Sequence, residues 1–482
     1  MAKNASEQWS LKSEFSDADL GDERRRKRLV DIAGRMQSDP KAGFPTMMGS
    51  EAATEGLYRF LNNPGFSEYD VLEPHIRQTE QRAKQSERVL AIHDQTPFVF
   101  DFQDQQEAVG PLNTSEQGFY GQISLAVAGD GRRRPIGVPA FSTIFRTEDS
   151  EESSPDRRLS GADYANKEQR ESDWWMRHAR WTQGVFAESS AEVIHVGDAE
   201  FDSYERLAQL EHLDYQYVTR ARRRKVTVCE TGKYQWIGEA AEQIEPVIEK
   251  RIDLSRRQPS SAPRRRAKYP DRPARQADIC MGTQQVRLHK PNYLPDQMSG
   301  TLEVTMVRVW EPNPPDGEDP VEWVLLTNQP FDNTTQSRAD YIQQVVDDYR
   351  ARWRIESYFK ALKTGCSYRK RQLENRGSLL KALALSVPMA WLLMAMRDWG
   401  RQQTDQPAKW YFTEETLEVL RHFADRAVPE SPTLHEATFA IAGLGGHLQS
   451  NGPPGWQILQ RGLTKLERYT EGWQAALQKS DP

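Results

Sequence analysis

The chain has 482 residues, of which 37% are hydrophobic and 28% charged, and its 64 Lys and Arg against 70 Asp and Glu give a formal net charge of −6. At about 150 residues per domain this length predicts about three domains, and the apolar runs fall short of the ~20 residues of a membrane helix, so we expect no membrane span. Three cysteines without a CxxC pair, and an N-terminus without an apolar secretory core, argue against a disulfide framework and a structural zinc site and favour the cytoplasm.

The net charge conceals two strongly basic segments. Residues 220–290 contain 18 Lys and Arg against 8 Asp and Glu, and residues 350–371 contain 8 basic residues and one acid, Glu356. Such patches are typical of proteins that bind the phosphates of nucleic acids. On charge alone, solvated loops explain the pattern equally well.

The first 72 residues predict a small helical module. Helix-start signals occur at Ser16 or Asp17 and again at Ser50, and prolines separate the segments. The first expected helix places Arg24, Arg25, Arg26, Lys27 and Arg28 beside the apolar Leu29 and Val30. A basic face next to an apolar one suits a helix that lies on a nucleic-acid backbone, although a solvated surface helix would look similar.

From residue 89 to about 223 the sequence alternates between apolar runs and turn signals. Strands are predicted at 89–94, 121–130, 135–145, 192–198 and 215–222, with a helix over 173–189 and an exposed acidic loop over 145–170. Three strands, a helix and two further strands indicate a mixed sheet with helices packed on it.

Residues 224–330 interrupt this pattern. The Pro- and Arg-rich stretch 256–276 cannot form a central strand, whereas 301–310 and 322–330 have the composition of strands. We therefore expect a β-rich insertion with a basic loop. One long helix is expected from about 338 to 364, and helices from 378 to the C-terminus.

Two of the predicted strands end in an aspartate. Asp94 closes the run VLAIHD, and Asp198 closes EVIHVGD. A carboxylate at the end of a buried strand costs several kcal/mol to desolvate unless it is paired or binds a cation. Each aspartate alone could instead cap the following turn.

The predicted helix over 349–365 carries a polar stripe. At 100° per residue, five of its residues fall within an arc of about 80°: Tyr349, Arg352, Glu356, Lys360 and Lys363. An ordinary amphipathic helix with an Arg352–Glu356 ion pair would account for the stability of this helix. It would not account for the grouping of several basic residues around a single acid, which suits a phosphate backbone. Three carboxylates from two strand ends and a helix could hold two Mg²⁺ ions beside phosphate-binding side chains.

Several motifs occur in a fixed order along the chain. They are DADLGDERRRKRLV (17–30), EGLYRFLNNP (55–64), LAIHDQT (90–96), VGDAEFDSYERL (196–207), WVLLTNQP (323–330), YRARWRIESYFKALKTG (349–365) and LGGHLQS (444–450). With them, the sequence resembles bacterial cut-and-paste DDE transposases of the transposon-five type, whose subgroup is defined by a Tyr-(2)-Arg-(3)-Glu-(6)-Lys signature. Tyr349, Arg352, Glu356 and Lys363 match that spacing.

This resemblance implies an α/β fold with an RNase H-like mixed-sheet core, in which Asp94, Asp198 and Glu356 bind two Mg²⁺ ions, or Mn²⁺ in their place. It implies nicking of a transposon end, a DNA hairpin intermediate, and joining of the 3′-hydroxyl to target DNA. Trp323 would hold the base that leaves the stack, and Tyr349, Arg352, Lys360 and Lys363 would contact DNA phosphates. Arg24, Arg25 and Arg28 would bind the terminal inverted repeat.

The resemblance also divides the chain. We expect a helical DNA-end-binding domain (1–72), a catalytic core in two parts (73–223 and 331–375), the β-rich insertion (224–330) and a C-terminal helical domain that pairs two copies (376–482). Ala199 departs from the arginine that the family has after the second aspartate. Two alternatives stay open at this point: a non-catalytic DNA-binding inhibitor derived from a transposase, and an RNase H-like nuclease that cuts without joining.

Overall fold

The computed structural model describes residues 10–100, 109–112, 116–146, 173–257, 271–368, 373, 375–401 and 405–480. Most of the predicted acidic loop and of the basic loop therefore lies outside the described residues. The chain folds as two compact units: Met1–Arg158, Arg177–Glu192 and Trp353–Pro482 form unit 1, and Leu159–Met176 and Val193–Arg352 form unit 2. This division is coarser than the five expected segments and does not test their boundaries.

Unit 1 begins with five helices, as the sequence predicts for its first part. They are α1 (Leu11–Glu14), α2 (Glu23–Ser38), α3 (Phe44–Met48), α4 (Glu51–Leu61) and α5 (Glu68–Ala83). The Ser50 hydroxyl accepts a hydrogen bond from Ala53 N and caps α4, which confirms that helix start. The first long helix, α2, instead begins at Glu23, and the carboxylate of its N-cap Asp22 accepts a hydrogen bond from Arg24 N, so the start expected at Ser16 or Asp17 is wrong.

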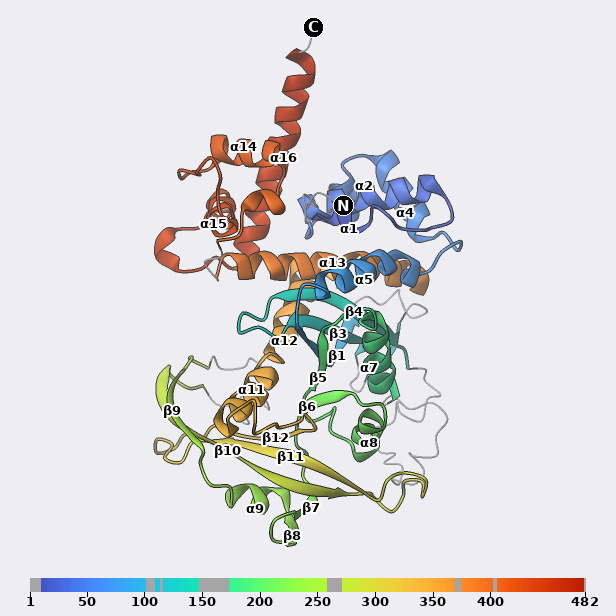
Figure 1. Cartoon of the computed structure of the whole chain (residues 1–482). Coiled ribbons are helices and arrows are strands. Elements are labelled where there is room, and N and C mark those ends of the chain that lie inside the picture. The colour runs from blue at the N-terminus through green and yellow to red at the C-terminus, as the bar shows by residue number, and fades with distance from the viewer. Residues whose placement is uncertain are drawn as a thin grey trace. The chain divides into compact units, whose positions relative to one another are not determined.

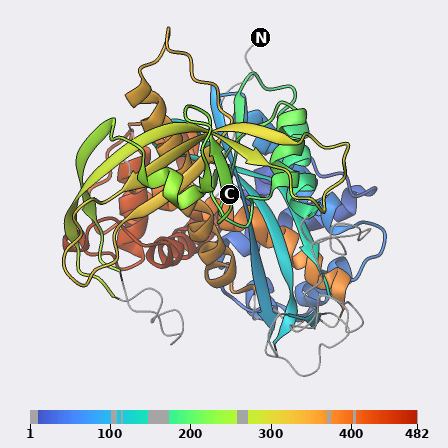
Figure 2. The same cartoon turned by 90° about the horizontal axis from the view of Figure 1, so that it is seen from below.

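The sheet of unit 1 is antiparallel. Its strands are β1 (Arg88–Phe100), β2 (Gly110–Pro111), β3 (Gln117–Ala128) and β4 (Pro135–Ile144). β3 pairs with β1 along one edge and with β2 and β4 along the other, and Figure 2 shows these blue and teal strands side by side. Helix α5 packs against β4. The order of three long strands, the helix α7 (Asp173–Val185) and then β5 and β6 confirms the predicted sequence of elements.

The C-terminal part of unit 1 is helical, as predicted. It contains α12 (Trp353–Lys360), the π-helix η2 (Ala361–Gly365), α13 (Arg376–Trp399), α14 (Glu414–Phe423), α15 (Leu434–Leu444) and α16 (Trp456–Ser480), with short 3₁₀ turns at Ala408–Trp410 and Gln449–Asn451. Within the described part of the chain, α13 alone is long and apolar enough to cross a membrane by length and composition, so our estimate of the apolar runs was wrong for this helix. Its apolar window is buried in the structure, as in the core helix of a globular protein.

Unit 2 contains one mixed sheet (Figures 1 and 2). Its elements are β5 (Glu192–Gly197), α8 (Tyr204–His212), β6 (Gln216–Arg220), β7 (Lys225–Val228), β8 (Tyr234–Trp236), α9 (Ile237–Glu242), β9 (Ile248–Leu254), β10 (Arg275–His289), β11 (Thr301–Trp310), β12 (Glu322–Thr327) and α11 (Arg338–Arg350). β5 and β6 are parallel, and the other pairs are antiparallel in the order β6-β12-β11-β10-β7-β8, with β9 also on β10. The segment after residue 224 is therefore β-rich, as predicted.

Candidate active site

Asp94 lies within β1 and not at its end. The strand continues to Phe100, and Asp94 is paired with Ile123 of β3. The side chain is half-buried, and its Oδ1 accepts a hydrogen bond from Gln95 N at 2.8 Å. The expectation that Asp94 closes its strand is therefore wrong, because pairing with β3 carries the extended backbone six residues further.

Asp198 directly follows β5, as predicted. Its Oδ1 accepts a hydrogen bond from Glu200 N at 2.7 Å, and its backbone carbonyl accepts one from the Thr219 hydroxyl at 2.8 Å. Thr219 belongs to β6, the parallel neighbour of β5, so this contact fixes the turn that presents the carboxylate. Burial, and then the negative charge of Asp198, raises the pKa of Glu200.

A buried aspartate that the sequence did not single out lies four residues further on. Asp202 is 1% exposed, forms an ion pair with Arg224, and accepts a hydrogen bond from Arg222 N at 2.5 Å. Burial raises its pKa, although Arg224 opposes this change. Asp202 therefore anchors the basic run after β6 to the turn that follows Asp198.

The polar stripe does not lie on one continuous helix. Helix α11 ends at Arg350, a turn over residues 351 and 352 interrupts it, and α12 begins at Trp353. Lys363 then lies on the π-helix that follows α12. The predicted single helix and its arc of about 80° are therefore wrong, although the apolar Ile355, Phe359 and Leu362 of this segment are buried in the core.

In unit 2, the structure brings four of the predicted site residues together: Asp198, Trp323, Tyr349 and Arg352. The rings of Trp323 and Tyr349 meet edge to face, with centroids 5.6 Å apart. Burial is the main cause of the raised pKa of Tyr349. The charges of Arg352 and Arg220 lower this pKa and the charge of Asp198 raises it, so all three charged groups act on the Tyr349 hydroxyl. Arg352 also forms a side-chain hydrogen bond with Tyr349.

In unit 1, the helix that carries Glu356 packs against the strand that carries Asp94. Glu356 is half-buried in the first turn of α12. The Lys363 amine donates a hydrogen bond to the Thr96 hydroxyl at 2.6 Å and lies 5.5 Å from the ring centre of Phe98. Lys363 therefore holds a positive charge against β1, two residues beyond Asp94, while Lys360 is exposed.

The three predicted metal ligands are divided between the units, with Asp94 and Glu356 in unit 1 and Asp198 in unit 2. Carboxylate oxygens are the hard donors that Mg²⁺ prefers, and all three side chains are only half-buried, so their chemistry fits this ion. Among the residues that the structure describes, however, no group of three or more His, Cys, Asp or Glu is arranged to hold a metal ion. The shared metal site stays a prediction.

The three predicted end-binding arginines lie on α2, in different surroundings. Arg24 and Arg28 are exposed, whereas Arg25 donates a hydrogen bond to Leu20 O at 2.9 Å. Arg28 rests on α4 at Gly56, where a Cβ atom would approach Nη1 to 2.9 Å. Arg24 and Arg28 are therefore more accessible to a ligand, while Arg25 stabilises the module.

A second basic surface lies on the hairpin β7–β8 of unit 2. Tyr234 and Trp236 are 57% and 38% exposed. The Arg223 guanidinium lies 4.7 Å from the Trp236 ring centre, and the Lys225 amine lies 5.4 Å and 5.5 Å from Tyr234 and Trp236. The sequence signalled only the charge of this segment; exposed aromatic rings among cations are typical of surfaces that bind nucleic acids.

Comparison with known proteins agrees with these features. Residues 6–66 match a family model described as "Transposase DNA-binding", and residues 185–392 match one described as "Transposase DDE domain". The solved structure "Cryo-EM structure of piggyBac transposase synaptic complex with hairpin DNA (SNHP)" aligns with 96% of this chain and 79% of that chain at 9% identity. The TM-score of this alignment is 0.34. The two family matches give the chain a transposase DNA-binding domain followed by a transposase DDE domain, so it is a DNA transposase of the DDE type.

Proposed function

We propose that this chain is an active cut-and-paste transposase of the Tyr-Arg-Glu-Lys signature subgroup, which excises its element through DNA hairpins and joins the 3′-hydroxyl ends to target DNA. The observation that carries the proposal is the cluster in unit 2, where Tyr349 contacts Trp323 and shares electrostatic contact with Arg352 and Asp198. Two of the four signature residues, Tyr349 and Arg352, thus lie in one cluster with the expected base-binding tryptophan and one of the three expected metal ligands, which supports the proposal.

Asp94, Asp198 and Glu356 would hold two Mg²⁺ ions, for which Mn²⁺ substitutes. The bound ions would supply an activated water and stabilise the leaving oxygen during phosphoryl transfer. An RNase H-like core, with antiparallel strands next to a parallel pair, is the fold that we propose for this site.

The remaining site residues would position the DNA. Arg352, Lys360 and Lys363 present positive charge to the backbone phosphates, and Tyr349 orders Arg352 through their hydrogen bond. A hairpin requires one base to leave the stack, and Trp323 offers it an aromatic surface. Since Trp323 already packs edge-on against Tyr349, its ring is held in place before the base arrives.

End recognition and assembly follow from the same proposal. Arg24 and Arg28, and Arg25 to a lesser degree, bind the terminal inverted repeat through phosphates. Two copies pair through the helical region 376–482 in the complex that joins both ends, and each copy cuts mainly the end that the other binds. The protein acts in the bacterial cytoplasm, at the nucleoid when bound to DNA.

The test requires the DNA substrate, which the sequences flanking the gene would reveal as short inverted repeats. Purified protein is incubated with DNA that carries these repeats and Mg²⁺, and products are separated under denaturing conditions. We expect nicked, hairpinned and joined products. Nicks without joining would favour a nuclease, and tight binding without cleavage would favour an inhibitor.

The carboxylate assignment has its own test. We expect Asp94→Asn, Asp198→Asn and Glu356→Gln each to abolish cleavage and leave end binding within about threefold, since each replacement preserves shape and removes one charged ligand. Glu200→Gln is the matched control: this carboxylate lies two residues from Asp198 but is not one of the three expected ligands, and its loss should preserve cleavage. Mg²⁺-dependent cleavage by any of the three variants would refute the assignment.

A further inference from the structure

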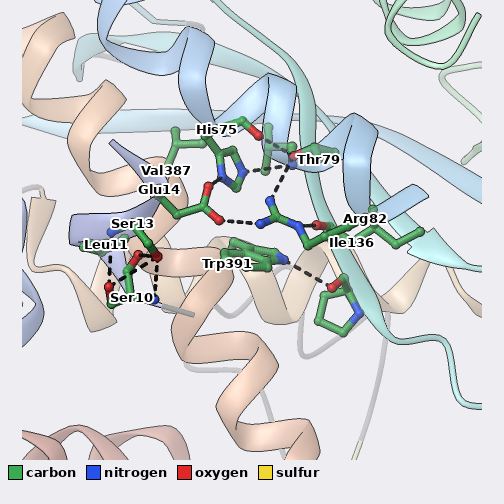
Figure 3. A network of polar contacts seen from close by, with 12 residues as sticks. Ser10, Leu11, Ser13, Glu14, His75, Thr79, Arg82, Ile136, Val387 and Trp391 are labelled. Carbon is green, nitrogen blue, oxygen red and sulfur yellow. Dashed lines mark hydrogen bonds and ion pairs between the residues drawn. The ribbon is translucent and has the colours of Figure 1, made fainter. Parts of the chain in front are cut away.

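Glu14, at the end of α1, is a buried carboxylate that the proposed chemistry does not use. It is 4% exposed, and Figure 3 shows it between two side chains of α5, His75 and Arg82. His75 Nδ1 lies 2.8 Å from Glu14 Oε2, and Arg82 forms an ion pair with Glu14 Oε1. A short N-terminal helix is thus joined to α5 through one buried carboxylate.

The same two side chains of α5 also bind strand β4. His75 Nε2 accepts a hydrogen bond from Val138 N at 3.1 Å, and Arg82 Nε donates one to Ile136 O at 2.6 Å. Because a backbone N–H can only donate, Nε2 of His75 is unprotonated and its Nδ1–H donates to Glu14. Each α5 side chain therefore bridges Glu14 to the β4 backbone.

Helix α13 completes the network. The Arg82 guanidinium lies 4.0 Å from the ring centre of Trp391, whose indole N–H donates to Pro135 O at 3.2 Å. Burial raises the pKa of Glu14, but the charge of Arg82 and the hydrogen bonds from His75 and Arg82 outweigh it and lower the pKa below its usual value. The ionised carboxylate is what neutralises the buried guanidinium.

A second contact links the same parts at another point. Ser378 Oγ donates a hydrogen bond to Asn62 Oδ1 at 2.5 Å, and the Lys381 amine donates to Leu61 O at 3.2 Å. Asn62 follows α4, and the two donors lie on α13. Attachment at the end of α1 and at the end of α4 fixes the orientation of the helical module, as one attachment alone would not.

Glu14 and Asn62 lie inside the segment that matches a transposase DNA-binding domain, whereas α5, β4 and α13 lie outside it. β4 pairs with β3, and β3 pairs with β1, which carries Asp94. We propose that Glu14 is a positioning residue, which locks the DNA-binding module to the Asp94 sheet so that a bound DNA end is presented to the active site in one orientation. The expected effect of Glu14 on cleavage rests on the proposed function. Its expected effect on the orientation of the module rests on the contacts alone.

The first variant is Glu14→Gln in the full chain, which keeps the size of the side chain and leaves Arg82 without its carboxylate. The second is E14Q/R82M, which also removes the buried charge and keeps an apolar contact with Trp391. Glu23→Gln is the matched control, because Glu23 belongs to the same module but pairs with Arg26 at the surface. Each variant is assayed for thermal stability, end-DNA affinity and cleavage rate at saturating DNA.

We expect both Glu14 variants to bind end DNA within about threefold of the wild type but to cleave at least about tenfold more slowly, because misplacement by about 1 Å can cost 100-fold. E14Q/R82M should recover thermal stability without recovering cleavage. A merely structural role predicts the opposite: cleavage returns together with stability in the double variant. That result, or wild-type cleavage by both variants, would overturn the inference.

Orientation is measured independently of catalysis by electron–electron resonance between spin labels at Lys27→Cys on α2 and Asp130→Cys after β3, in a background with Cys229 and Cys280 replaced by serine. We expect one narrow distance distribution in the otherwise wild-type chain and a broad one in E14Q/R82M. An unchanged narrow distribution would refute the lock. If no DNA end is cleaved by any form, the proposed function is wrong, and the spin-label result still decides the orientation role.

Discussion

A buried histidine that contacts strands β3 and β4 gives the most direct quantitative prediction. His178 of α7 is fully buried and lies between two hydroxyls: its Nδ1 is 3.0 Å from Ser124 Oγ on β3, and its Nε2 is 2.7 Å from Ser142 Oγ on β4. Ser124 Oγ is also 2.8 Å from Nδ1 of His93, the neighbour of Asp94. Burial lowers the pKa of His178 from 6.5 to about 3.

The sign of the pH effect follows from this lowered pKa. Below pH 6.5 the unfolded chain binds a proton at residue 178, whereas the folded chain binds it only near pH 3. The free energy of unfolding is therefore unaffected above pH 6.5 and falls as the pH decreases through this window. At about 1.4 kcal/mol per pH unit the loss reaches ~2 kcal/mol at pH 5 and ~5 kcal/mol near pH 3, a large part of the 5–15 kcal/mol that stabilises typical domains.

The assay compares urea unfolding of the wild type and His178→Gln at pH 7, 6, 5 and 4, with hydrogen exchange of β3 and β4 as a local measure. Glutamine preserves one polar contact and does not titrate, so we expect the wild type to lose stability more steeply than the variant, by about 1.4 kcal/mol per pH unit below pH 6. His212→Gln removes an exposed histidine and controls for the loss of one imidazole. Equal slopes for wild type and His178→Gln would refute the reasoning.

Three further predictions concern DNA binding, cleavage and packing. Arg28→Ala should reduce the slope of the logarithm of the end-binding constant against the logarithm of salt concentration by about one unit, because this exposed arginine is expected to contact a phosphate. Loss of Arg26, which pairs with Glu23, should leave the slope unchanged. Equal slopes for the wild type and Arg28→Ala would remove Arg28 from the interface. Lys363→Met should slow cleavage by about thirtyfold and leave end binding within about threefold, since a unit charge at an assumed separation of ~7 Å from a phosphate is worth ~2 kcal/mol at an effective dielectric constant of 20. An equal loss of cleavage and binding would contradict a role at the cleaved phosphate. Gly462→Ala should lower the free energy of unfolding by about 1–3 kcal/mol, because its Cβ would lie 1.8 Å from a carbonyl oxygen of α15. Gly472→Ala on the same helix would bring its Cβ near no other atom and should raise the free energy of unfolding by up to about 1 kcal/mol. Thermal unfolding of both variants tests this pair of expectations.

The sequence located most elements of the catalytic region because burial leaves a direct pattern in it. Strands β4, β5 and β11 begin at the predicted residues and end within one residue of the predicted ends, and Asp198 follows its strand as expected. The sequence also predicted local hydrogen bonding, because the cap of α4 joins Ser50 to the backbone N–H of Ala53, only three residues away. These features depend on residues close together in the sequence, so the sequence alone is enough to predict them.

Features that depend on distant partners were not predictable in this way. β1 continues past Asp94 through Pro97 because β3 pairs with it as far as Phe100, and a proline argues against a strand when the partner is unknown. The stripe over 349–365 has helical periodicity throughout, yet the helix breaks at 351–352.

The amino-acid sequence by itself determined which residues are candidates for chemistry: three carboxylates, one tryptophan and a spaced set of cations. Only the tertiary structure decided which of them meet, placing Trp323 against Tyr349 and Lys363 against Thr96. It alone revealed Glu14 between His75 and Arg82, residues more than sixty positions away. The physical reason is that burial and capping act between neighbours in the chain, whereas charge pairing in the interior depends on segments that only folding brings together.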